Sequence, residues 1–177
     1  MIKTIFYSVA LGTILLSSGA IATPVTNPTF MPESSHVLSD TGYIAASINT
    51  AALEQSVFNK INDYRASQRL AKLTRNSVMD NQAKIHSQNM ANGKVPFGHT
   101  GFSERVKAIK ANGIPYSSAA ENVAYNQGYS DPATQAVQGW LKSPGHLANI
   151  RGNFEKTGIG VASNSRGEIY FTQIFLR

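Results

Sequence analysis

The sequence predicts an α+β domain in which a β-sheet is packed between layers of helices. Apolar residues recur at helical spacing through much of residues 51–111, whereas short β-rich segments bounded by Gly, Asn or Ser occupy much of residues 121–176. The last segment, Glu168–Leu176, is apolar at both sets of alternating positions, so both faces of that strand must be covered. A sheet with helices on both sides meets this demand. The two faces comprise Ile169, Phe171 and Phe175 on one side and Tyr170, Ile174 and Leu176 on the other.

Three helices are predicted in the first half of the domain. The first spans about residues 51–70, the second about residues 76–92 and the third about residues 103–111. The second and third each end at an Asn-Gly pair, which is a common stop signal for a helix. The first helix has one apolar face, formed by Leu53, Val57, Ile61 and Tyr64.

Two later helices are predicted to begin at the same local motif, a capping residue followed by proline. Asp131-Pro132 and Ser143-Pro144 each place a capping side chain before a proline at the first helical position, where a missing N–H costs nothing. The fourth helix is expected over about residues 132–141, and a short fifth helix begins at Pro144. Strands are predicted at Glu121–Tyr125, Gly158–Ser163 and Glu168–Leu176, with residues 164–167 as a hairpin turn between the last two.

Residues 1–22 have the pattern of an export signal. Lys3 supplies a positive start, residues 5–16 are apolar, and Ala20-Ile21-Ala22 is a small-x-small cleavage site. The alternative is a membrane anchor, but the apolar run is shorter than the roughly 18–20 residues that a bilayer core demands. The prediction is a secreted protein, extracellular or periplasmic, with no transmembrane anchor after cleavage.

Residues 23–50 are predicted to be a flexible spacer, because they contain three prolines and many Ser, Thr and Asn residues without a sustained period. Residues 51–177 then form the single folded domain of this chain of 177 residues. The chain has no cysteine, which excludes disulfides, thiolate zinc sites and cysteine nucleophiles. Any metal must therefore use histidine and carboxylate ligands.

The positive charge of the chain is unevenly distributed. The net charge is +6, and residues 60–110 hold ten Lys or Arg against three acidic residues, a local charge of +7. The simpler interpretation is solubility, because the basic residues are scattered along helices. The sharper one is attraction to an anionic cell-surface polymer or lipid, which outside the cytoplasm is a better expectation than nucleic acid.

Three polar residues are the candidates for chemistry. His99 lies in a glycine-flanked loop, Glu121 opens a strand, and His146 is the third residue after the predicted cap of the fifth helix, where the helix dipole favours neutral imidazole. Two imidazoles and one carboxylate are a known hydrolytic zinc set. They are 22 and 25 residues apart in the sequence, so only the fold could bring them close together.

The other histidines and a tempting serine have simpler interpretations. His36 lies in the predicted spacer, and His86 lies on the apolar stripe of the second helix, where a hydrogen-bonded core histidine is the commoner outcome. Ser143 is predicted to be a helix cap, since no GxSxG elbow accompanies it. Gly158-Ile159-Gly160 lacks the rest of a dinucleotide fingerprint and is interpreted as a packing feature.

Six short segments occur in a specific order along residues 53–177. They are NDYR at 62–65, AKIHS at 83–87, HTGF at 99–102 followed by Arg105, AENVA at 120–124, WLKSPGHLANI at 140–150 and GIGV at 158–161. In this order they resemble the CAP superfamily of SCP-like secreted proteins, most closely its small bacterial members.

The resemblance implies a three-layer α-β-α sandwich and a cleft where His99, Glu121 and His146 converge to hold zinc or another divalent cation. Arg105, Asn122 and Ser143 would support this cleft. Eukaryotic relatives carry a second glutamate at the place of Ser143, so the ligand set here is incomplete, and water or a polar group such as Gln173 would complete it.

The resemblance does not imply one activity, because members of the superfamily have different roles. The favoured hypothesis is a secreted binding or interaction module that holds a divalent metal, a small ligand, a lipid or an anionic cell-surface polymer. The alternative is a metal-dependent hydrolase acting on peptide or cell-wall material, with Glu121 as the catalytic base. One glutamate cannot easily serve as both metal ligand and proton acceptor, which favours the module.

Overall fold

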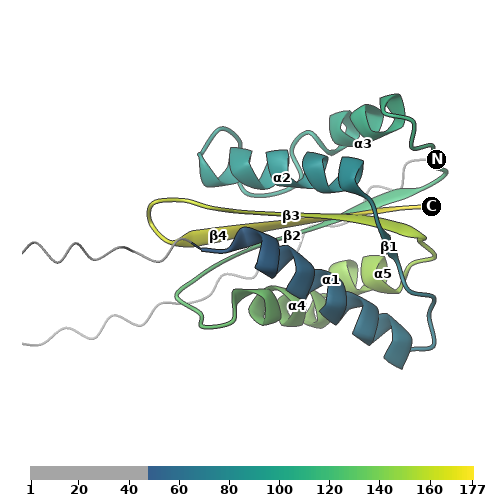
Figure 1. Ribbon diagram of the computed structural model, residues 1–177, viewed down its shortest axis with the longest axis horizontal. Coiled ribbons are helices and arrows are strands. Elements are labelled where there is room, and N and C mark those ends of the chain that lie inside the picture. The colour runs from purple at the N-terminus through teal and green to yellow at the C-terminus, as the bar shows by residue number, and fades with distance from the viewer. Residues whose placement is uncertain (1–47) are drawn as a thin grey trace, which may run out of the picture. The chain divides into compact units, whose positions relative to one another are not determined.

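A computed structural model describes residues 48–177, which contain five helices and four strands (Figure 1). The predicted signal peptide and nearly all of the predicted spacer lie outside the described residues. Among residues 48–177, no helix is both long enough and apolar enough to cross a membrane. The elements in chain order are α1 Thr50–Ser67, β1 Thr74–Arg75, α2 Ser77–Ala91, α3 Phe102–Ala111, β2 Ala119–Gln127, α4 Pro132–Lys142, α5 Pro144–Arg151, β3 Lys156–Ser163 and β4 Glu168–Leu176.

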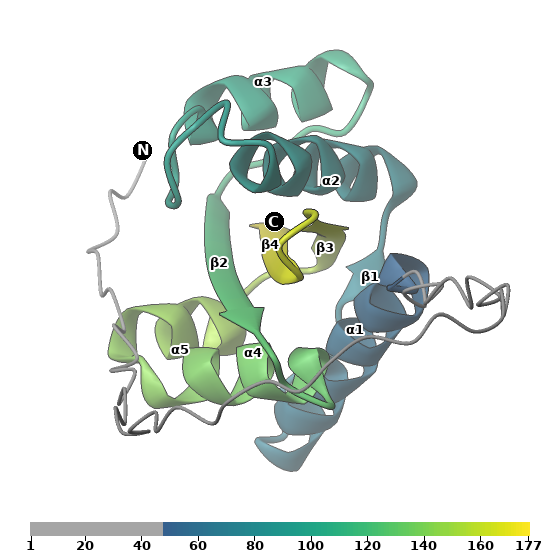
Figure 2. The ribbon, with the colours of Figure 1, turned by 90° about the vertical axis from the view of Figure 1, so that its left-hand side faces the viewer.

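The four strands form one sheet in the order β1-β3-β4-β2. β4 is antiparallel to both of its neighbours, whereas the short β1 runs parallel to β3. Figure 2 looks along β3 and β4 and shows α2 and α3 on one side of the sheet and α1, α4 and α5 on the other. The predicted α-β-α layering is confirmed.

The two faces of β4 pack against different helical layers, as the alternation in its sequence predicts. Phe171 and Phe175 are buried with residues of α1, α4 and α5, including Trp140. Ile174 and Leu176 are buried with residues of α2 and α3. The central strand is therefore covered on both sides.

The GIGV segment is a packing feature, as predicted. Gly158 and Gly160 lie on β3 directly against the backbone of α2. A Cβ added to Gly160 would stand 2.0 Å from the Lys84 nitrogen, and one added to Gly158 would stand 2.3 Å from the Met79 Cβ. These glycines let the helix and the strand approach more closely than any side chain would allow.

The helices begin and end within three residues of the predicted limits, but the two proline-led starts differ. The Asp131 carboxylate accepts the Thr134 N–H at 3.0 Å and caps α4 as expected. The Ser143 hydroxyl makes no such cap for α5, and its Oγ is buried without a hydrogen-bond partner in the described chain. The physical reason is that Ser143 ends α4 and begins α5 through its backbone: its N–H donates to the Trp140 carbonyl and its carbonyl accepts the Leu147 N–H.

Candidate functional site

Glu121 lies at the edge strand β2 and faces the layer of α2 and α3. Its strand partner Ile174 belongs to the core beneath those two helices, and only 1% of the Glu121 side chain is exposed. Arg105 on α3 donates to both carboxylate oxygens, with Nε–Oε2 at 2.9 Å and Nη2–Oε1 at 2.7 Å. This two-point ion pair compensates the burial of the carboxylate and fixes its plane.

His99 approaches the same carboxylate from the loop before α3. Its Nδ1 lies 2.9 Å from Glu121 Oε1, and its side chain is 24% exposed. Because a carboxylate held by a guanidinium only accepts hydrogen bonds, Nδ1 is the donor. Arg105 also donates from Nη1 to the Thr100 carbonyl at 2.7 Å, so one arginine holds both the carboxylate and the loop that carries the imidazole.

His86 on α2 holds the same loop through a hydrogen bond to its backbone. It is 2% exposed, and its Nε2 donates to the Gly98 carbonyl at 2.8 Å, which confirms the prediction of a hydrogen-bonded core histidine. Burial is the largest cause that lowers the pKa of His86, and the positive charge of Arg105 lowers it further. The neutral imidazole is therefore favoured at this position.

His146 belongs to the opposite helical layer, since α5 packs on the other side of the sheet. The residue is half-buried. Burial lowers the pKa of His146, and the charge of His99 contributes in the same direction, so the two imidazoles are within electrostatic reach. The sequence predicted a neutral His146 on the grounds of the helix dipole. The direction agrees, but the main cause is burial.

Two asparagines join α5 to β2. The Asn122 Nδ2 donates to the His146 carbonyl at 3.2 Å, so Asn122 supports the site through the backbone. Asn149 on α5 donates to the Asn122 Oδ1 at 2.9 Å and to the Glu121 carbonyl at 3.3 Å. Sequence reasoning passed over Asn149, although it lies inside the WLKSPGHLANI segment, because an asparagine on a helix carries no specific signal.

Gln173 does not take the place expected for it. Paired opposite Asn122, it points to the face of the sheet away from Glu121. It is fully buried, and its Nε2 donates to the Thr157 Oγ1 at 3.1 Å. Gln173 therefore does not complete a ligand set around Glu121.

The residues gathered here do not fit a divalent cation in this arrangement. Within residues 48–177, no group of three or more His, Asp or Glu side chains is placed to hold a metal ion. Both oxygens of Glu121 already accept hydrogen bonds from Arg105 and His99, and a metal would have to displace them beside a guanidinium charge. Zinc binding stays a prediction.

The comparison with protein families gives the class to which this fold and site belong. The family model described as CAP, the cysteine-rich secretory protein family, matches residues 58–175. The chain therefore belongs to the CAP family, although it contains no cysteine. No curated protein matches the chain.

Among solved structures, the chain is similar to an extracellular protein of Bacillus anthracis that contains an SCP domain. The two share 27% identity over 72% of this chain and 41% of that protein, with a TM-score of 0.58. A cysteine-rich secretory protein of Staphylococcus aureus matches at 21% identity, over 73% of this chain and 40% of its own, also with a TM-score of 0.58. This chain thus spans about two fifths of the length of both proteins.

An outer surface protein of Borrelia burgdorferi has the same fold over nearly its whole length. It is 18% identical, covers 73% of this chain and 96% of its own, and has a TM-score of 0.61. At such identities the likeness establishes the fold alone. The Bacillus anthracis protein is described as extracellular and the Borrelia burgdorferi protein as an outer surface protein.

Proposed function

We propose that this CAP-family protein is a secreted binding or interaction module. Its contact site is the edge of β2, where His99 and Glu121 from one layer approach His146 from the other. One observation carries the proposal: both oxygens of Glu121 are held by protein donors, two from Arg105 and one from His99. The carboxylate orients the imidazole of His99, whose side chain is 24% exposed at this edge.

The same observation argues against the alternative, a metal-dependent hydrolase. Such an enzyme needs metal ligands and a separate proton acceptor at the reacting water. Here the one carboxylate of the site serves as the structural partner of Arg105. A water at this position would compete with a guanidinium for the lone pairs of Glu121, which makes Glu121 a poor general base.

The chemistry of the site and the charge of the chain indicate the class of ligand. Loss of Lys3 with the predicted signal leaves a net charge of +5, because 15 basic residues face 10 acidic ones. Arg105 pairs with Glu121, so the one carboxylate of the site is compensated and does not repel an anionic group. An anionic cell-surface polymer, an anionic lipid or a small anionic ligand is the expected partner.

The test measures binding of the full mature chain to three probes: phosphatidylglycerol vesicles, soluble peptidoglycan fragments and Zn²⁺ alone. We expect at least one anionic probe to bind about tenfold more weakly to the His99→Ala/His146→Ala variant than to the parent protein. His36→Ala, which changes a histidine outside the described residues, is the matched control and should bind as the parent does. Equal binding by all three proteins would remove the imidazoles from the proposal.

The same preparation also tests the hydrolase. Casein or peptidoglycan fragments are incubated with the protein, with and without a chelator, and with Glu121→Ala. Cleavage that both the chelator and the substitution abolish would replace the binding module by an enzyme. We expect no cleavage that depends on Glu121.

A further inference from the structure

Two Asn-Gly pairs end the two helices on one side of the sheet (Figure 2). Asn92-Gly93 follows α2 and Asn112-Gly113 follows α3, and each asparagine is preceded by alanine. Both pairs are exposed to water. An Asn-Gly pair is chemically reactive, because glycine has no side chain to hinder the attack of its nitrogen on the asparagine side chain. The local sequence thus allows both pairs to react, and the structure decides which of them does.

The reaction is a deamidation that needs only water. The main-chain nitrogen of the glycine attacks the side-chain Cγ of the asparagine, and the new C–N bond closes a five-membered succinimide ring. The attacking nitrogen loses its proton, and the side-chain amide leaves as ammonia. Water then adds to either ring carbonyl and opens the ring, which gives aspartate or isoaspartate. Both products carry a negative charge where the amide was neutral.

The main chain protects the two pairs in the same way. The Gly93 N–H donates to the Met90 carbonyl at 3.0 Å. The Gly113 N–H donates to the Lys110 carbonyl at the same distance. The two glycines have similar positive φ angles, 67° and 83°, and both helices end in the same kind of turn. Each glycine nitrogen is therefore released when its helix end frays, which the last turn of a helix does readily.

The side chains of the two asparagines differ. Asn112 Nδ2 donates to the Ala108 carbonyl at 2.8 Å, so the nitrogen that has to leave is bound to the last turn of α3. Within residues 48–177, the Asn92 side chain makes no hydrogen bond. Its amide can rotate toward the Gly93 nitrogen as soon as the end of α2 frays. The Asn112 amide has to break a further contact first.

We propose that Asn92 is a site of spontaneous deamidation, and that the hydrogen bond to Ala108 protects Asn112 from the same reaction. Asn92 lies seven residues before His99, at the start of the loop that carries this imidazole. The product places a carboxylate at the C-terminal end of α2, where the helix dipole disfavours a negative charge. Isoaspartate also adds a carbon atom to the main chain. The modification therefore changes the charge and the path of the chain that leads to the candidate site.

The test follows both pairs in one sample of the full mature chain. The folded protein is incubated at neutral pH, and the peptides with Asn92 and Asn112 are quantified by mass spectrometry, with fragmentation that distinguishes aspartate from isoaspartate. We expect Asn92 to react about fivefold faster than Asn112, the ratio that corresponds to about 1 kcal/mol for one hydrogen bond. The control Asn92→Gln, whose longer side chain would have to close a six-membered ring, should stay unmodified at this position.

The same chain unfolded in urea is the reference for both pairs. Without the helices, the two Ala-Asn-Gly sequences should react at similar rates. If the folded protein converts Asn92 and Asn112 in the same ratio as the unfolded chain, the hydrogen bond to Ala108 gives no protection and the proposal fails. A folded protein in which Asn92 stays intact while the unfolded chain reacts would also overturn it, because the end of α2 would then shield the pair.

Discussion

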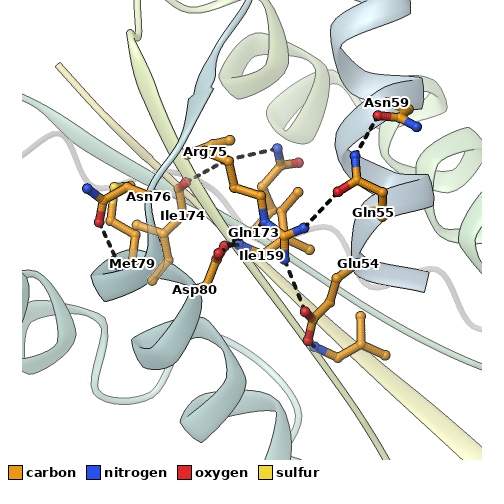
Figure 3. Close-up of polar contacts among 12 residues, drawn as sticks. Glu54, Gln55, Asn59, Arg75, Asn76, Met79, Asp80, Ile159, Gln173 and Ile174 are labelled. Atoms are coloured by element: carbon orange, nitrogen blue, oxygen red, sulfur yellow. Dashed lines mark hydrogen bonds and ion pairs between the residues drawn. The ribbon is translucent and has the colours of Figure 1, made fainter. Parts of the chain in front are cut away.

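Both edges of the sheet carry an arginine–carboxylate ion pair, but the carboxylates have different further partners at the two edges. At the β2 edge, Arg105 donates two hydrogen bonds to Glu121, and the third hydrogen bond to that carboxylate comes from the His99 side chain. At the β3 edge, Arg75 pairs with Asp80 and Glu54 (Figure 3). Each of these carboxylates also accepts a main-chain N–H, through Asp80 Oδ1 and Glu54 Oε1. One arrangement orients a side chain toward a possible ligand, whereas the other covers backbone. The role of each carboxylate therefore depends on the group that it contacts besides the arginine: a histidine side chain at the β2 edge, and main-chain N–H groups at the β3 edge.

Burial also separates the two edges. The Glu121 and Arg105 side chains are 1% and 9% exposed, whereas those of Glu54 and Arg75 are 11% and 23% exposed. A charge left alone in the drier environment has less water to compensate it. Damage at the β2 edge should therefore cost more free energy of unfolding than equal damage at the β3 edge.

The largest effect is expected for Glu121→Ala. It leaves the buried guanidinium of Arg105 without its partner, which costs about 3–5 kcal/mol in free energy of unfolding. Glu54→Ala leaves the Val161 N–H without its acceptor and should cost about 1–3 kcal/mol. Urea unfolding of both variants checks the comparison. Equal losses would mean that burial does not distinguish the two edges.

A smaller, more discriminating effect is expected at Asp80. Asp80→Asn keeps a side-chain oxygen that can accept the Ile159 N–H but removes the charge that pairs with Arg75. It should therefore cost less than Asp80→Ala, by about 1 kcal/mol, the net worth of a typical hydrogen bond. Urea unfolding gives the free energies, and hydrogen exchange at Ile159 reports the bond itself. If the two variants are equally unstable, the ion pair matters and the backbone contact does not.

A pH dependence should arise at the β2 edge. Burial lowers the pKa values of His86 and His146, so as the pH falls below about 6.5 the unfolded chain takes up protons that the folded protein does not. The stability that the two neutral histidines contribute is therefore full above that pH, and it is lost as the pH falls toward their lower folded-state pKa values. We expect the urea midpoint to fall between pH 7 and pH 5.

His86→Gln is the matched variant for this dependence, because the amide can still donate to the Gly98 carbonyl but does not titrate in this range. The fall of the urea midpoint between pH 7 and pH 5 should be smaller in this variant. A fall as large as that of the parent would assign the dependence to other groups.

Sequence periodicity predicted most helices and strands, because the apolar pattern within each of them recurs over several residues. Caps and glycine stops placed the helix ends, and the two apolar faces of Glu168–Leu176 predicted the layers. β1 was missed because two residues, Thr74 and Arg75, are too short to show any period. Hydrophobic patterning thus predicted the layers of the sandwich but not β1, the short outermost strand beside β3.

The polar residues were harder to predict, because their partners are remote in the chain. Glu54 contacts the N–H of Val161, 107 positions later, and no local pattern encodes such a pairing. The pairing of Glu121 with Arg105 was missed for the same reason. The position of Gln173 was available from the sequence, because alternation places it on the face of Phe171 and Phe175.

The smallest effect is expected at a third arginine–carboxylate pair near the β3–β4 turn. Arg166 and Asn164 donate to Glu168 and lower the pKa of that carboxyl to about 2. Because the Arg166 side chain is largely exposed, water replaces the contact when it is lost, and Arg166→Ala should leave the urea midpoint unchanged within error. The pKa of Glu168, followed by NMR, should rise only slightly, because Asn164 still donates to the carboxylate and a large rise would itself be a loss of stability. A clear fall in stability would mean that an exposed pair contributes as the buried ones do, and the contrast between the two edges could then not be ascribed to burial.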